Sequence, residues 1–83
     1  MKRMPRSLHT PEYERFRSLL VDARRKAGLS QAELAEKLSR PQSFVSKFER
    51  GERRLDVIEF KAVAEALNLD PLRLLRRLYR EVG

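Results

Sequence analysis

The segment of residues 29–51 constrains the fold more than any other part of this chain. Ser30 is suited to cap a helix N-terminus, and Glu33 completes a capping box in which each side chain binds the other residue's backbone N–H. Pro41 cannot continue that helix, because proline has no N–H and disfavours helical geometry in the residue before it. Proline nevertheless suits the first turn of a new helix. The segment therefore predicts two short helices separated by a tight break.

The second of these helices is predicted to run from about Pro41 to Arg50. Val45 and Phe48 recur at helical spacing on its inner face, and Gly51 can adopt the left-handed conformation that ends a helix. Two short helices joined by a turn of about three or four residues have the geometry of a helix-turn-helix.

The same segment resembles the phage-repressor and Cro-type helix-turn-helix domain of bacterial XRE-like transcriptional regulators. The resemblance covers about residues 16–75 and rests on a combined pattern: Gly28, Leu29, Ser30, Gln31, Glu33, Leu34, Ala35, Leu38, Ser43, Val45, Ser46, Glu49, Arg50 and Gly51. It implies a compact, all-α, five-helix, lambda-repressor-like domain whose second and third helices form the helix-turn-helix. Ser39 departs from the pattern, because many relatives have glycine in the turn. A serine there is expected to accept a positive φ at a cost of about 1 kcal/mol.

Helix signals also precede this segment, so we expect one domain over residues 10–83 after a basic, flexible arm of residues 1–9. Thr10 and Pro11 can cap and open a first helix that ends at Gly28. Its predicted inner face comprises Phe16, Leu19, Leu20, Ala23 and Ala27.

Two further helices are predicted after Gly51. Asp56 and Glu59 form a second potential capping box, and Asn68 can end the helix that they open. The inner face of that helix is predicted to comprise Val57, Phe60, Val63, Ala64 and Leu67. A fifth helix is predicted from Asp70-Pro71 to about Val82.

Composition narrows the class of partner. Lys and Arg number 19 against 12 Asp and Glu, and the formal net charge of +7 favours a polyanion, most simply double-stranded DNA. The chain has no cysteine, which excludes disulfides and a cysteine-based zinc site, and no apolar run approaches about 18 residues. With one histidine, no glycine-rich phosphate loop and no apolar carboxylate pair, we expect neither an enzyme nor a cofactor or metal. We expect a cytoplasmic, nucleoid-associated protein without a membrane partner.

The start of the third helix is predicted to contact DNA bases. A helix-turn-helix places this end in the major groove, and the predicted base-contacting residues are Gln42, Ser43, Phe44 and Lys47. Glutamine can bind adenine, lysine favours guanine, and serine is promiscuous. A phosphate contact is an alternative for Lys47. Phe44 is expected to point outward or sideways. It would then pack on a thymine methyl group or, equally, cover the stem of Lys47 or Phe48 one turn on.

The predicted phosphate contacts lie on this helix and around it. They are Gln31, Arg40, Ser46, Arg50, Arg53 and Arg54, with Gln31 placed at the N-terminus of the second helix. The resemblance also implies a structural ion pair between Arg24 and Glu49, which would tie the first helix to the third.

The fifth helix has more apolar residues than one buried face requires, which is typical of a helix that packs deeply or meets a partner. We predict a homodimer interface formed by Leu74, Leu78, Tyr79 and Val82. A scattered surface leucine is the alternative reading of Leu74.

These observations favour a sequence-specific DNA-binding transcriptional regulator, a repressor in the leading hypothesis, that binds a palindromic operator as a homodimer. The alternative is an antitoxin or a protein-interaction module of the same fold, whose main partner is a toxin or co-regulator. RNA is a weaker third partner, because A-form RNA does not offer an open major groove to a helix.

Overall fold

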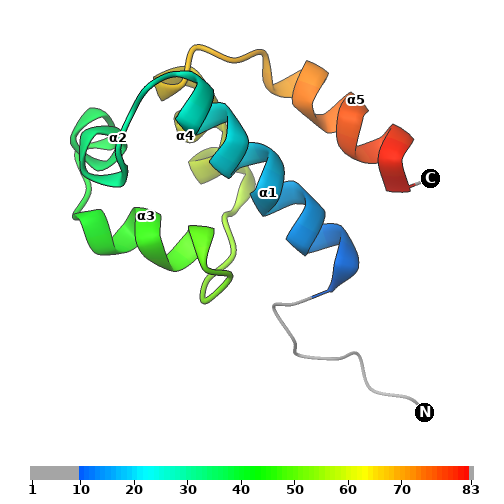
Figure 1. Cartoon of the computed structure of the whole chain (residues 1–83), viewed down its shortest axis with the longest axis horizontal. Coiled ribbons are helices and arrows are strands. Elements are labelled where there is room, and N and C mark those ends of the chain that lie inside the picture. Colours follow the sequence, from blue (N-terminus) through cyan, green and yellow to red (C-terminus); the bar gives the residue numbers. More distant parts are fainter. Residues whose placement is uncertain (1–9, 83) are drawn as a thin grey trace.

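The computed structural model describes residues 10–82, which form five α-helices and no strand (Figure 1). The helices are α1 Pro11–Lys26, α2 Gln31–Leu38, α3 Gln42–Glu49, α4 Val57–Ala66 and α5 Pro71–Val82. The predicted all-α, five-helix class is confirmed. The predicted arm of residues 1–9 lies outside the described residues.

Side-chain caps mark the starts of α1, α2 and α4. Thr10 Oγ1 accepts a hydrogen bond from the backbone of α1. At α2, Glu33 N–H donates to Ser30 Oγ at 3.0 Å, and Ser30 N–H donates to Glu33 Oε1 at 2.8 Å. At α4, Asp56 and Glu59 make the same reciprocal pair at 2.7 and 2.9 Å. Both predicted capping boxes are therefore confirmed.

The break between α2 and α3 differs from its prediction by one residue. Ser39 has the expected positive φ of 56°, so it closes α2 in the left-handed conformation. Pro41 is the N-cap of α3 rather than its first residue, since its ψ of 153° is extended and only its carbonyl joins the helix, accepting from Phe44 N–H at 3.0 Å.

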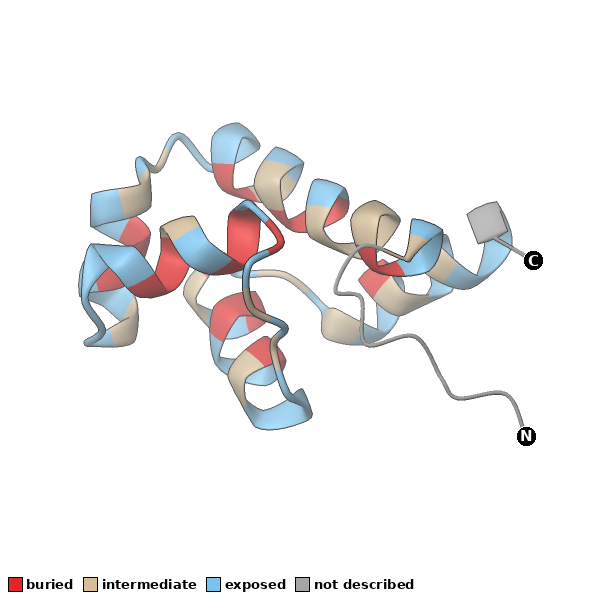
Figure 2. Cartoon of the chain, turned by 90° about the horizontal axis from the view of Figure 1, so that it is seen from below, coloured by how far each residue is buried: buried red, intermediate tan, exposed pale blue. Residues whose placement is uncertain are grey.

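The core forms where the helices face one another (Figure 2). α5 runs beside α1, while α2 and α3 lie towards the other end of the molecule (Figure 1). The buried residues of this core are Leu19, Leu20, Leu34, Ala35, Phe44, Val45, Phe48, Phe60, Val63, Leu67 and Leu74. Contacts of α3 with α1 and α2 fix the helix that is predicted to meet DNA.

Two residues predicted for the inner face lie outside it. Ala27 is exposed because it follows the last residue of α1 as its C-cap. Val57 is 78% exposed because it is the first residue of α4, where the side chain is tilted past the helix end and away from the core.

Candidate nucleic-acid interface

The exposed face of α3 presents three of the four predicted base-contacting residues. Gln42, Ser43 and Lys47 are exposed, whereas Val45 and Phe48 on the opposite side are almost completely buried. This division follows the helical repeat, because the inner residues are apolar and the outer ones polar. The helix therefore offers an amide, a hydroxyl and an ammonium group to solvent.

A buried ion pair holds the C-terminal end of α3 against α1. Arg24 donates from Nε to Glu49 Oε2 at 2.7 Å and from Nη2 to Oε1 at 3.0 Å. Arg24 Nη1 also donates to the Leu29 carbonyl at 2.7 Å, and Arg17 donates to the Glu49 carbonyl. Arg24 and Glu49 are the two buried charged residues among residues 10–80. The pairing implied by the resemblance is thus present, and it can fix the orientation of α3.

Gln31 joins this network from the first turn of α2. Its Nε2 donates to Glu49 Oε1 at 2.8 Å, and the residue is half-buried. The amide side chain is therefore already oriented beside the N-terminus of α2, where backbone N–H groups and the helix dipole favour an anion.

Phe44 does not point outward towards a base, so that expectation is wrong, whereas the alternative that it covers Phe48 is confirmed. Its side chain is 7% exposed, and its ring packs edge-to-face on Phe48 at a centroid distance of 5.6 Å. Two guanidinium groups cover it, with the Cζ atoms of Arg40 and Arg53 at 4.1 and 4.9 Å from the ring centroid. These cation–π contacts make the ring part of the core and remove it from the base-contacting set.

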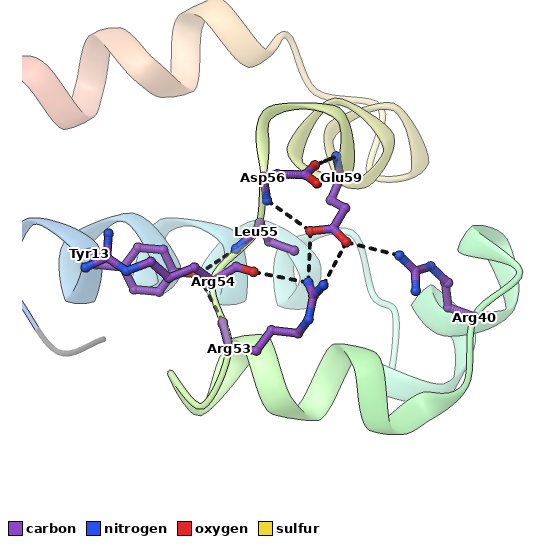
Figure 3. A network of polar contacts seen from close by, with 7 residues as sticks. All are labelled: Tyr13, Arg40, Arg53, Arg54, Leu55, Asp56 and Glu59. Atoms are coloured by element: carbon purple, nitrogen blue, oxygen red, sulfur yellow. Dashed lines mark hydrogen bonds and ion pairs between the residues drawn. The ribbon is translucent and has the colours of Figure 1, made fainter. Parts of the chain in front are cut away.

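Arg40 and Arg53, both predicted phosphate contacts, bind one carboxylate (Figure 3). Arg53 forms a bidentate pair with Glu59, with both N···O distances at 2.9 Å, and Arg40 Nη2 lies 3.1 Å from Glu59 Oε2. The hydrogen bonds from Arg53, together with the Asp56 backbone N–H, lower the pKa of the Glu59 carboxyl to about 2. Glu59 therefore stays ionised at neutral pH and links the α2–α3 turn to the loop after α3.

That loop is also tied to α1. The Tyr13 hydroxyl donates to the Arg53 carbonyl at 3.3 Å and accepts from Leu55 N–H at 3.2 Å. The Arg54 guanidinium lies 4.7 Å from the centre of the Tyr13 ring. Burial is the main cause that raises the pKa of the Tyr13 hydroxyl above its ordinary value. The backbone that carries Arg53 and Arg54 is thus held in place.

Sequence reasoning does not identify Tyr13 and Glu59 as residues that support the interface. Glu59 is recognisable in the sequence only as a helix cap, which it also is. Tyr13 has no predicted role, and its partners lie some forty positions away in the chain. No local pattern connects residues so far apart.

The other predicted phosphate contacts have mixed surroundings. Arg50 is exposed and pairs with Glu52 at 2.9 Å, and that bond lowers the pKa of the Glu52 carboxyl. Ser46 is half-buried, with its hydroxyl donating to the Ser43 carbonyl at 3.3 Å. A surface pair such as Arg50–Glu52 is weak and exchanges readily for a phosphate.

The expected dimer residues do not share one surface. Leu74 is 7% exposed and belongs to the core, because α5 packs its Leu74 side onto α1, so its assignment to an exposed interface is wrong. Leu78 is half-buried, Tyr79 is 77% exposed, and the side chain of Val82 lies outside the described residues. Leu72 is a further large exposed residue of α5 that the predicted interface does not include.

A second surface feature is an apolar groove of about 640 Å³ between the start of α1, the start of α4 and α5. Val57 and Leu72 line it from α4 and α5.

Within residues 10–82, no group of three or more His, Cys, Asp or Glu side chains could hold a metal. No helix in that range is long and apolar enough to cross a membrane.

The α2–turn–α3 unit and its exposed outer face define a helix-turn-helix protein. A helix-turn-helix family profile matches residues 20–74. The structure of an XRE-family like protein from Pseudomonas syringae pv. tomato str. DC3000 is similar, with 49% sequence identity, a TM-score of 0.83 and coverage of 87% of this chain and 88% of that chain. The chain belongs to the XRE-like family of helix-turn-helix DNA-binding transcriptional regulators.

More distant structures share the fold. The wild-type restriction-modification controller protein C.Esp1396I has 19% identity and a TM-score of 0.80, with coverage of 89% of this chain and 97% of that one. The clp gene regulator ClgR from C. glutamicum has 21% identity and a TM-score of 0.77, with coverage of 90% and 97%. No curated protein matches the chain in sequence.

Proposed function

We propose that this protein is a sequence-specific transcriptional repressor that inserts α3 into the major groove of an operator and binds as a homodimer. The observation that carries the proposal is the polar outer face of α3, where Gln42, Ser43 and Lys47 are exposed on a helix whose other side is locked into the core. A rigid helix with a polar outer face is what direct readout of base edges requires.

Each of these residues has a defined role in the proposal. Gln42 binds adenine through its amide, and Lys47 donates to guanine acceptors or to a neighbouring phosphate. Ser43 contributes a hydroxyl with little base preference. A good bidentate contact discriminates between bases by about 1–3 kcal/mol.

The surrounding groups bind the DNA backbone. Gln31 and the N-terminus of α2 lie on one side of α3, and Arg40 and Arg53 lie on the other. Arg54 follows Arg53 in the loop after α3 and lies over the Tyr13 ring of α1. Such contacts set the register of the protein on the duplex and supply most of the salt-dependent affinity.

The proposed dimer interface is formed by the exposed apolar residues of α5 and excludes Leu74, which is buried. Leu72 and Tyr79 are 61% and 77% exposed, and Leu72 borders the groove that Val57 also lines. A dimer that binds two half-sites needs its two third helices in successive major grooves, about 34 Å apart. The operator is then a palindrome.

Selection from random duplexes, followed by a salt titration, tests the DNA-binding proposal. We expect a palindromic site and a steep fall in affinity with salt. Gln42→Ala and Lys47→Ala should relax preference at defined bases, whereas Arg54→Ala should weaken binding to all sequences alike. Selected pools that share no half-site even at low salt would refute a sequence-specific role.

Light scattering tests the dimer. Leu72→Glu should give a monomer, and Ser18→Glu, an exposed change on α1, should leave the dimer intact. Leu74→Glu is unsuitable because it places a charge in the core. A wild-type protein that remains monomeric at high micromolar concentration contradicts the proposed assembly.

A second candidate function is supported by exposed apolar side chains on α4 and α5. Val57, Ile58, Leu72 and Tyr79 are large, apolar and exposed, which suits a protein partner such as a toxin or a co-regulator. A monomer that binds no duplex in the selection above would favour this alternative.

A further inference from the structure

The Glu59 carboxylate joins two segments that are separate in the sequence. Arg40 lies in the turn before α3, and Arg53 lies in the loop after it. Glu59 projects from the first turn of α4 and accepts hydrogen bonds from both guanidinium groups (Figure 3). We infer that Glu59 is a positioning residue for DNA, which holds Arg40 and Arg53 together as a phosphate-binding pair beside α3; this inference rests on the proposed function.

Both arginines are held in a defined place. Their guanidinium groups lie 4.1 and 4.9 Å from the centre of the Phe44 ring, which is itself packed against Phe48. The ring and the carboxylate together fix two long side chains that would otherwise sample many rotamers. The pair is therefore preorganised before any ligand binds.

The pair lies beside the proposed base-contacting face. Phe44 follows Ser43 directly and precedes Lys47 by three residues, so it borders that face on the helix surface. Gln31 is hydrogen-bonded to Glu49, which is five residues from Phe44. At about 100° per residue, Glu49 therefore lies about 140° from Phe44 around the helix axis. The arginine pair and Gln31 thus flank the exposed face from its two sides, as contacts to two DNA strands require.

The arginines keep donors for a phosphate. The bond to Glu59 uses one of the five N–H donors of Arg40, and the Arg40 side chain is 43% exposed. Arg53 uses three donors, two for Glu59 and one for the Arg54 carbonyl, and its side chain is 38% exposed. With Arg54 and Asp56, which belong to the same network (Figure 3), three guanidinium groups and two carboxylates leave a net charge of +1, so the cluster attracts an anion.

The carboxylate itself is fully used. Glu59 Oε1 accepts from Asp56 N–H and Arg53, and Oε2 accepts from Arg53 and Arg40, which matches its capacity of about four hydrogen bonds. Three of these four hydrogen bonds come from the two arginines, so the carboxylate mainly neutralises and orients their guanidinium groups.

Glu59→Gln is the decisive variant. Glutamine also serves in a capping box, so α4 keeps its N-terminal cap while the charge that holds the arginines is lost. Glu33→Gln is the matched control, because Glu33 has the same capping role in α2 and the same charge change, and its described partner is Ser30. Affinity for a mixed-sequence duplex of about two helical turns is measured against salt for each full-length variant, with folding checked by circular dichroism.

The direction of the change in DNA affinity distinguishes loss of an acidic charge from loss of arginine positioning. Removing an acid should by itself strengthen DNA binding, and Glu33→Gln is expected to do so slightly. Glu59→Gln is expected to weaken binding about threefold to tenfold, because two side chains must now be ordered on binding. The slope of log affinity against log salt should fall by about one for each phosphate that the variant no longer binds.

A double-mutant cycle shows whether Glu59 acts through the arginines. In an R40Q/R53Q background, Glu59→Gln should no longer weaken binding, whereas a merely structural role predicts weakening in both backgrounds. The inference is overturned if Glu59→Gln binds as tightly as Glu33→Gln, or if it weakens both backgrounds equally. Wild-type protein that binds no duplex would instead refute the proposed function itself.

Discussion

Replacing Arg24 with methionine removes the cation from the buried pair between α1 and α3. Three hydrogen bonds disappear with it, two to Glu49 and one to the Leu29 carbonyl. The Glu49 side chain, which is 5% exposed in the wild-type structure, is then left with the Gln31 amide as the remaining described partner of its carboxylate. Methionine fills part of the space but cannot neutralise the charge.

The expected loss is about 3–5 kcal/mol of unfolding free energy, the range for a buried pair that loses one partner. A domain of 83 residues is expected to have about 4–12 kcal/mol in total, so the variant retains little stability. Urea unfolding followed by circular dichroism measures the change, and the midpoint should fall by about 2–4 M.

The double variant R24M/E49L is the matched control, because it removes both charges and leaves apolar side chains of similar volume. It should recover at least half of the lost stability, since no uncompensated charge remains. A loss below about 1 kcal/mol in the single variant would refute the reasoning, because the pair would then behave like an exposed one.

Three further outcomes are expected from single changes measured by the same unfolding assay. Phe44→Ala should cost about 3 kcal/mol or more because it opens a cavity beneath two arginines, and a change below about 1 kcal/mol would mean that the ring is not part of the core. Ser39→Gly should raise stability by up to about 1 kcal/mol, since the φ of 56° suits glycine better, and a loss would contradict this. Glu59 has a folded pKa of about 2, below its ordinary 4.5, so it contributes stability above pH 4.5 that is lost as pH falls through about 2. The stability gap between wild type and Glu59→Gln should therefore shrink as pH falls from 4.5 and vanish below about pH 2, whereas a gap that stays constant with pH would contradict the assigned pKa.

The helix boundaries were predictable because their signals are local. Ser30 with Glu33 and Asp56 with Glu59 each lie within one helical turn, so capping chemistry could be read from spacing alone. The left-handed conformation of Ser39 followed from the same local reasoning.

The placement of Phe44 was not predictable from spacing. The helical repeat puts it at the border between the inner and outer faces, where either environment is compatible with the pattern. In the structure, two arginines cover the ring, and they lie four residues before it and nine residues after it in the chain. Only the fold brings these two arginines together over the ring.

The burial of Leu74 on α5 was likewise not predictable from helical spacing. This helix has apolar residues on more than one side, so periodicity could not tell which side packs on α1. In the fold, α5 packs on α1 and α4 with Leu74 in the core and with Leu72 and Tyr79 exposed.

Within the eight residues of α3, those needed for folding differ from those that face solvent. Val45, Phe48 and Glu49 determine whether the helix stays in place, because they are buried. Gln42 and Lys47 are exposed, so mutational drift at these two positions costs the fold little. Under the proposed function, a lineage of such proteins can therefore acquire new target sequences through a few substitutions, without first evolving compensating changes in the scaffold.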